Sequence, residues 1–144
     1  MPELPDCTAL LTLAAVVHQD LTRPVAARLR YHRSDPYAVH LDHHVDLEQP
    51  VTWAISRELL TDGLTARVGL GDVSVHPSPG PADDTLSICL SPPGGTLVLR
   101  APRSLVRTFL KASYAIVPAG GESAYYDMDE LLSRFWSREA PSAG

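Results

Sequence analysis

Alternating hydrophobic and polar residues dominate the first part of the chain, a pattern typical of half-buried β-strands. Residues 7–17 form an apolar run that predicts a strand, although its length and its alanines leave a helix open. The next segment, 22–32, places Arg28 and Arg30 on one face. Its other face is apolar and carries Val25, Ala27, Leu29 and Tyr31. A turn at 34–36, built on Asp35 and Pro36, then leads into a third strand.

The third predicted strand has two chemically different faces. Its apolar face carries Tyr37, Val39, Leu41, His43 and Val45. Its polar face carries His40, Asp42, His44 and Asp46. A break at 48–50 follows, and residues 51–55 alternate again as a strand.

The hydrophobic period changes twice from that of a strand to that of a helix. Ser56 is the expected N-cap of a short helix that stops at Gly63. After a glycine turn at 69–72, a short strand with Val73 and Val75 on one face and a hairpin across 84–102 are predicted. Pro102 opens a second helix with an apolar side, formed by Leu105, Val106, Phe109 and Leu110. Asp127 and Glu130 form a capping box for a C-terminal helix. These elements predict a mostly-β domain with two or three helices.

Two stretches of the chain share a pattern. Residues 53–60 and 99–106 both run from a strand into an arginine and an apolar helix, and several short strands precede each. The pattern favours two β-sheet-plus-helix halves, although chance competes with it over so short a stretch.

Composition narrows the class of protein. The 144-residue chain has the length of one domain, and 44% hydrophobic with 20% charged residues is a globular balance. A formal net charge of −5 disfavours a nucleic-acid binder, which gathers Lys and Arg against phosphates. Cys7 and Cys89 are expected to be buried reduced thiols. The apolar run at 7–17 falls short of the roughly 20 residues of a membrane span, so a cytoplasmic protein is expected.

The cluster of histidines and aspartates at 40–46 is the most chemical-looking feature. His40, Asp42 and His44 are weak candidates for a metal site, because two histidines and a carboxylate are a known ligand set. Side chains on one strand face stand about 7 Å apart, so a solvated polar face is the favoured interpretation and no metal is expected. His43 is expected to be a hydrogen-bonded core or interface histidine.

Other catalytic patterns are missing from the sequence. There is no G-x-S-x-G elbow, and the glycines at 69–71 precede a strand, so a tight turn is favoured over a phosphate-binding loop. The basic candidates could form a nucleic-acid patch, but a solvated face with acidic partners is favoured; they are Arg28, Arg30, Arg100, Arg103 and Arg107. The aromatic residues Tyr31, Tyr37 and Trp53 are expected in the core rather than stacked on bases. No catalytic residue and no cofactor are predicted.

Three ordered blocks resemble the SsgA-like proteins, the sporulation and cell-division family of actinomycetes. The first follows P-V-x-x-x-L-R-Y-x-x-x-D-P-Y-A-V and includes Leu29, Arg30, Tyr31, Asp35, Pro36 and Tyr37. The second follows V-x-W-x-F-x-R-[DE]-L-L-x-x-G-L and includes Trp53, Arg57, Leu59, Leu60 and Gly63. The third follows G-D-V-x-V-x-P and includes Gly71 and Asp72. Shorter stretches at 91–94, 109–113 and 117–122 extend the resemblance across residues 7–136. Ile55 and His43 depart from it, since the family tends to carry Phe there.

The resemblance implies a fold and a role. It implies an α+β, mostly antiparallel fold: a whirly-like two-sheet domain with two repeated β-sheet-plus-helix halves and a C-terminal helix. A single SsgA-like domain is expected at 1–137, with a flexible tail at 138–144. The implied role is a non-enzymatic regulator that acts by protein–protein interaction in septum-site selection, septation or cell-wall remodelling.

The implied partners are cell-division proteins. FtsZ would bind the protein directly or through another SsgA-like protein, and this would take place at division septa. The protein is expected to be a homo-oligomer, and the resemblance suggests a trimer. The partner-binding residues stay unknown. The alternative is a whirly-type single-stranded nucleic-acid-binding protein.

Overall fold

The computed structural model describes residues 4–19, 21–78 and 84–125, which form eight strands and three helices. The strands are β1 (Cys7–His18), β2 (Leu21–Tyr31), β3 (Ala38–His43), β4 (Val51–Ser56), β5 (Val68–Leu70), β6 (Val73–Pro77), β7 (Thr85–Leu90) and β8 (Leu97–Pro102). The helices are α1 (Arg57–Gly63), α2 (Arg103–Ile116) and α3 (Glu122–Tyr125). The mostly antiparallel β architecture predicted from the sequence is confirmed. The predicted helix from Asp127 and the tail at 138–144 lie outside the described residues.

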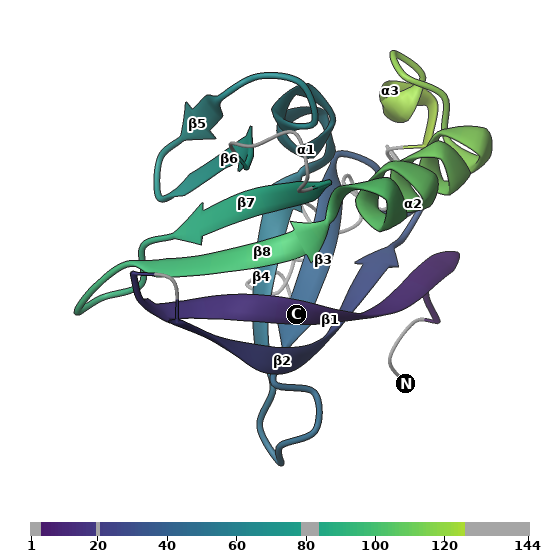
Figure 1. Ribbon diagram of the computed structural model, residues 1–144. Coiled ribbons are helices and arrows are strands. Elements are labelled where there is room, and N and C mark those ends of the chain that lie inside the picture. Colours follow the sequence, from purple (N-terminus) through teal and green to yellow (C-terminus); the bar gives the residue numbers. More distant parts are fainter. Residues whose placement is uncertain (1–3, 20, 79–83, 126–144) are drawn as a thin grey trace, which may run out of the picture.

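The strands form one curled, half-barrel sheet rather than two sheets (Figure 1). All neighbours are antiparallel, in the order β4-β3-β2-β1-β8-β7-β6-β5. Each set of four consecutive strands precedes a helix, but β1 hydrogen-bonds to β8 and joins the two sets. The two-sheet arrangement of repeated halves is therefore not what the described residues show. The joining contact pairs residues far apart in sequence, which a local hydrophobic pattern does not reveal.

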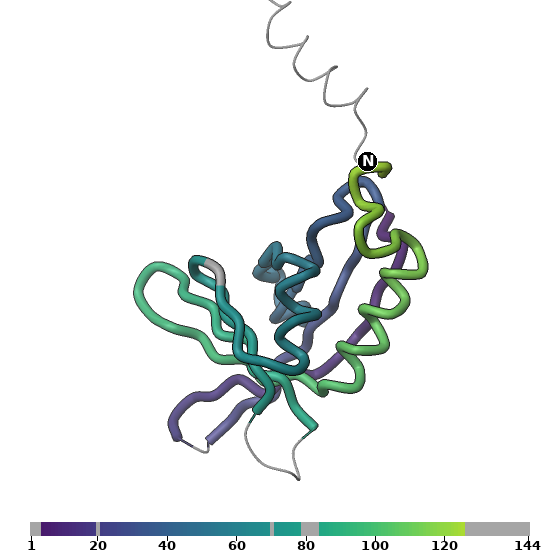
Figure 2. Tube along the Cα trace, turned by 90° about the horizontal axis from the view of Figure 1, so that it is seen from above, coloured from purple at the N-terminus to yellow at the C-terminus, as the bar shows by residue number. Residues whose placement is uncertain are grey.

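The core lies on the inner face of the sheet, where α2 runs beside β1 and β8 and next to α1 (Figures 1 and 2). The predicted inward face of β2 is confirmed, since Val25, Ala27, Leu29 and Tyr31 are all buried. The hairpin of β7 and β8 alternates as predicted and buries Leu86, Ile88, Leu90, Leu99 and Ala101. The apolar side of α2 contributes Val106, Phe109 and Leu110, with Leu105 partly buried.

The third strand is shorter than its pattern predicted. It begins at Ala38, so Tyr37 belongs to the preceding turn and is 50% exposed, against the prediction of a core position. It ends at His43, because His44 adopts a left-handed backbone with φ of 59°. The alternation of faces holds only within a strand, and therefore His44 and Val45 no longer follow it.

Local signals around α1 are confirmed at its start and differ at its end. The hydroxyl of Ser56 accepts a hydrogen bond from the Leu59 amide at 3.1 Å, as an N-cap does. Gly63 is the last helical residue, and Leu64 after it keeps a right-handed backbone. The glycine is needed for space instead, because a Cβ at position 63 would lie 2.6 Å from the Cβ of Val75 on β6.

A buried arginine links α1 to α2 and to the segment after it. Arg57 is 1% exposed, and its Nη1 donates to the carbonyls of Ser113 and Val117 at 3.1 and 2.9 Å. Its Nη2 donates to Glu122 Oε2 at 3.0 Å. The guanidinium lies between two aromatic rings, with Cζ 4.8 Å from the centroid of Tyr31 and 4.0 Å from that of Tyr114. Arg57 therefore holds three separate segments of the chain together.

The two cysteines lie far apart in the sequence, on β1 and β7. Cys7 and Cys89 are free thiols, and both are only partly buried, whereas full burial was expected. Within the described residues, no helix is long and apolar enough to cross a membrane.

Candidate interaction surface

A buried carboxylate occupies the middle of the polar face of β3. Asp42 is 2% exposed, because the register places it between Arg28 on β2 and Thr52 on β4. Its Oδ2 accepts from Arg28 Nε at 3.0 Å and from Arg30 Nε at 2.7 Å. Its Oδ1 accepts from Arg30 Nη2 at 2.9 Å and from the Thr52 hydroxyl at 2.6 Å. These four bonds use the acceptor capacity of a carboxylate, and the prediction of a solvated Asp42 is therefore wrong.

The structure does not bring the three weak metal candidates together. Asp42 is fully engaged by its arginines and threonine, and His40 Nε2 lies 3.7 Å from Asp35 Oδ2. His44 follows the end of β3, where its Nδ1 lies 2.7 Å from Nδ1 of the buried His43. Burial and the neighbouring His44 lower the pKa of His43. No group of three or more potential ligands in the described parts of the chain could hold a metal ion.

Acidification is expected to destabilise the fold through Asp42. Burial alone would raise the pKa of this carboxyl, but hydrogen bonds from Arg30, Thr52 and Arg28 outweigh it and lower the pKa to about 2. A depressed folded-state pKa contributes stability above the unfolded value of 3.8, and this stability is lost as the pH falls towards 2. The expected loss is about 2 kcal/mol in the free energy of unfolding. Urea unfolding at a series of pH values measures it.

The matched variant for this prediction is Asp42→Asn. It cannot titrate, so its free energy of unfolding is expected to change less over the same acid range, although it starts lower at neutral pH. Equal acid dependence in the two proteins would show that Asp42 is not the group responsible.

The five arginines that the sequence grouped as basic candidates do not form one patch. Arg28 and Arg30 bind Asp42, and Arg103 Nη1 lies 3.8 Å from Asp84 Oδ1. For these three, the predicted acidic partners are confirmed. Arg107 lies on α2, which covers the inner face of the sheet. Arg100 lies on the outer face of β8, and no carboxylate of the described residues pairs with it.

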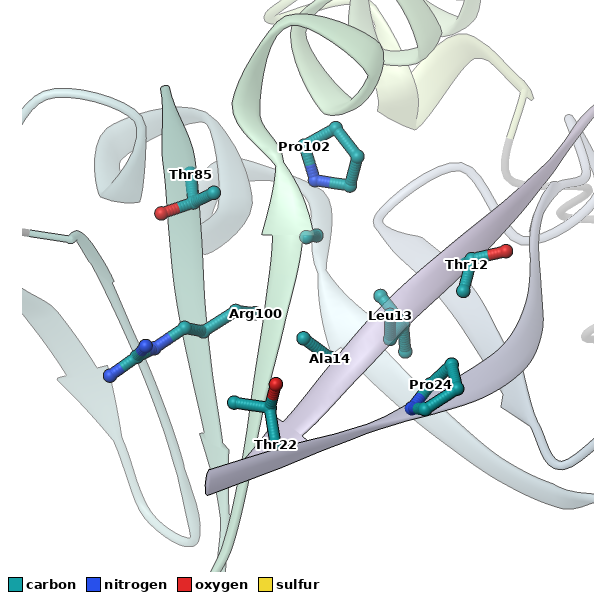
Figure 3. Close-up of a pocket in the computed structure, with 9 residues that line it drawn as sticks. Thr12, Leu13, Ala14, Thr22, Pro24, Thr85, Arg100 and Pro102 are labelled. Atoms are coloured by element: carbon teal, nitrogen blue, oxygen red, sulfur yellow. The ribbon is translucent and has the colours of Figure 1, made fainter. Parts of the chain in front are cut away.

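Arg100 lies at an open groove where the two sets of strands meet. Only Ala14–Arg100 and Ala15–Leu99 pair across β1 and β8, so the strands diverge on either side of this contact. The groove has a volume of about 410 Å³. Its lining consists of Thr12, Leu13 and Ala14 from β1, Thr22 and Pro24 from β2, Thr85 from β7, and Arg100, Ala101 and Pro102 from β8 (Figure 3). Among the described residues that line it, Arg100 is the only ionisable one.

The sequence predicted the outward position of Arg100 but not the groove beside it. Alternation in β8 placed Leu97, Leu99 and Ala101 inward, which correctly leaves Arg100 outward. The facing wall comes from β1 and β2, at the opposite end of the chain, and a local period carries no information about it. Apolar and hydroxyl-bearing walls with one fixed cation suit a binding surface rather than a reaction centre.

Comparison with known proteins shows which family the chain belongs to. Residues 25–122 match the family model described as Streptomyces sporulation and cell division protein, SsgA. The chain belongs to the SsgA family. It is 42% identical over 123 residues to the sporulation-specific cell division protein SsgB of Streptomyces coelicolor, covering 85% of this chain and 90% of that protein. SsgB of Thermobifida fusca is 38% identical over 130 residues, which cover 90% and 94% of the two chains.

Solved structures of the SsgA family share this fold. One comes from work on SsgB mutations that correlate to longitudinal cell division during sporulation of Streptomyces coelicolor. It has a TM-score of 0.78 at 40% identity, over 83% of this chain and 94% of the other. The SsgA-like sporulation-specific cell division protein from Thermobifida fusca gives a TM-score of 0.80 at 35% identity, over 94% and 99%. These relatives are cell-division proteins of a family not known as enzymes.

Most positions that match the SsgA family blocks build the scaffold. Leu29, Tyr31, Arg57, Leu60 and Gly63 are buried, while Leu59 and Trp53 pack against the core. The Tyr31 hydroxyl donates to the Pro36 carbonyl at 2.9 Å and fixes the turn that contains Asp35. Gly71, with φ of 62°, forms the turn to β6 beside Asp72, as the predicted tight turn requires. The three blocks therefore contain mainly residues that stabilise the fold. Of the described residues that line the groove, only Pro24 belongs to one of these blocks.

Proposed function

We propose that this protein is a non-enzymatic regulator of sporulation and cell division that acts by binding other proteins. Its place would be septum-site selection, septation or the associated remodelling of the cell wall. The match to the SsgA family and the 42% identity to a sporulation-specific cell division protein carry the proposal. The described structure supports it in two ways. The buried charges of Asp42 and Arg57 are bonded within the scaffold, and the groove at the β1–β8 contact offers a candidate surface for binding.

The proposed partners are proteins of the division machinery. FtsZ is the first candidate, bound directly or through another SsgA-like protein at the division septum. The protein would act as a homo-oligomer, and a trimer is the expected state. In such an assembly, binding energy concentrates in a few buried anchors rather than in total contact area.

Co-sedimentation with FtsZ polymers tests the proposal. The protein is expected to pellet with FtsZ that has polymerised in GTP and to stay in the supernatant with FtsZ held in GDP. Sedimentation equilibrium on the same sample is expected to give the mass of a trimer. Bovine serum albumin in a parallel tube measures trapping by the pellet.

Two results would redirect the proposal. Pelleting that requires an added SsgA-like protein would replace direct FtsZ binding by an intermediary. Tight and salt-sensitive binding to a single-stranded DNA oligonucleotide would instead favour a nucleic-acid-binding protein, since counterion release makes phosphate contacts depend steeply on salt.

A further inference from the structure

We propose that the groove at the β1–β8 contact binds an acidic, extended segment of a partner protein, with Arg100 receiving a carboxylate of that segment. The inference rests on the proposed function in one respect, since it takes the occupant to be a protein. It names the chemistry of that occupant, which the family relationship leaves open.

Among the described residues, Arg23, Arg67, Arg100 and Arg107 have no acidic partner, and of these Arg100 lines the groove. Arg28 and Arg30 share Asp42, Arg33 binds Asp6, and Arg57 binds Glu122. Within the described residues, no acceptor is found for any nitrogen of Arg100. A guanidinium carries five N–H donors and is always charged, so this cation is left for a group outside the described chain.

Protein atoms enclose the Arg100 side chain as far as Nε. Arg100 is half-buried, and its Nε is enclosed by protein while its terminal nitrogens are not. Figure 3 shows the side chain extended from β8 across β7 and away from Thr22 and Pro24, so its terminal nitrogens lie beside the groove rather than between its walls. An enclosed stem with an open fork loses little side-chain entropy on binding, which favours recognition of a planar carboxylate by two parallel hydrogen bonds.

The groups around Arg100 also favour a negatively charged occupant. The register places Ser87 beside Arg100 on β7 and His76 beside Ser87 on β6. Ser87 is 4% exposed and its hydroxyl lies 2.9 Å from that of Ser78. Burial, and then the positive charge of Arg67, lower the pKa of His76, which favours its neutral form. This row of the sheet contains a cation and neutral polar groups but no carboxylate, so it is complementary to an acidic partner.

The shape of the groove favours side-chain recognition of an extended segment. Its volume of about 410 Å³ suits a few residues rather than a folded domain. Pro24 and Pro102 in the walls have no backbone N–H to donate to an added strand, and β2 and β7 pair with a neighbour on each side. These walls favour recognition through side chains over the addition of a ninth strand. A single cation also differs from the row of cations that a nucleic-acid backbone requires.

Titration of the full-length, ¹⁵N-labelled protein with an acetylated and amidated hexaglutamate peptide tests the inference. Saturable shifts are expected at the amides of Thr12, Ala14, Thr22 and Thr85, and hexaglutamine is expected to cause none. Arg100→Gln is expected to weaken binding about tenfold, the usual effect of losing a hydrogen-bonded charge. Arg107→Gln, which makes the same charge change on α2, is the matched control and is expected to bind as the unchanged protein does. Thermal unfolding midpoints of both variants verify that they are folded.

Several outcomes would overturn the inference. They are the absence of saturable shifts, equal binding by Arg100→Gln, and binding of free glutamate as tight as that of the peptide. Preferential binding of a single-stranded dT12 oligonucleotide at Arg100 would also overturn it and assign the groove to nucleic acid. The titration contains no division protein, so its result is independent of the co-sedimentation with FtsZ. Loss of peptide binding with intact co-sedimentation would refute the groove alone.

Discussion

Replacement of Arg57 by methionine is expected to lower the free energy of unfolding by about 3 kcal/mol, the usual scale for breaking a buried ion pair. The variant leaves the carbonyls of Ser113 and Val117 without their donor and the Glu122 carboxylate without its partner. It also removes the cation between the rings of Tyr31 and Tyr114. Methionine restores much of the volume, so the loss reports mainly on hydrogen bonds and charge.

Two further variants separate these contributions. Arg57→Lys keeps the charge but not the planar fork that reaches two carbonyls and a carboxylate at once, so an intermediate loss is expected. Arg67→Met removes an exposed arginine and is expected to change stability by less than about 0.5 kcal/mol. Chemical denaturation of the variants measures the differences. A loss below about 1 kcal/mol for Arg57→Met would show that Arg57 does not hold the segments together.

Replacement of Gly63 by valine is also expected to cost about 3 kcal/mol, at the upper end for overpacking a core. Gly63 has an ordinary helical backbone, so the cost does not come from conformational strain at a left-handed position. It comes from the close approach of α1 to β6, where a new Cβ would meet both Cβ and Cγ1 of Val75. Either α1 or β6 must move, and both carry fully buried core residues, Leu60 and Val75.

A double-mutant cycle attributes this cost to one contact. Val75→Ala removes both γ-methyl groups of Val75, and therefore Gly63→Val and Val75→Ala together are expected to cost less than the sum of the separate losses. Gly95→Val is the control, because no atom lies within 4 Å of a Cβ at that position. Additive losses in urea unfolding would mean that the two residues are not in contact.

Prediction from the sequence was most successful where burial follows a local period. The inward face of β2, the hairpin of β7 and β8, the Ser56 N-cap and the apolar side of α2 are confirmed by the structure. Prediction was wrong at the ends of β3, since the pattern of alternation continued through residues that already belonged to turns. Tyr37 was placed inside for this reason, and His44 was placed on one face with Asp42.

The candidate site could be predicted only in part, because the decisive neighbours are distant in sequence. Asp42 looked like a solvated ligand candidate, yet Arg28, Arg30 and Thr52 bury it through pairing with two other strands. In the sequence, Arg100 was one of five similar arginines. The structure shows that three of the others, Arg28, Arg30 and Arg103, have acidic partners. The pairing that distinguishes Arg100 is with Ala14 on β1.

The sequence by itself determined most of the strands, the helices α1 and α2, the helix cap and the family, since each depends on neighbouring residues or on ordered blocks of residue types. The tertiary structure alone decided that β1 and β8 join the strands into one sheet, that Arg57 lies between two tyrosines, and that a groove opens beside Arg100. The physical reason is that these features depend on contacts between segments many residues apart. Several strand partners satisfy the same alternating pattern equally well, and packing of the whole chain selects among them.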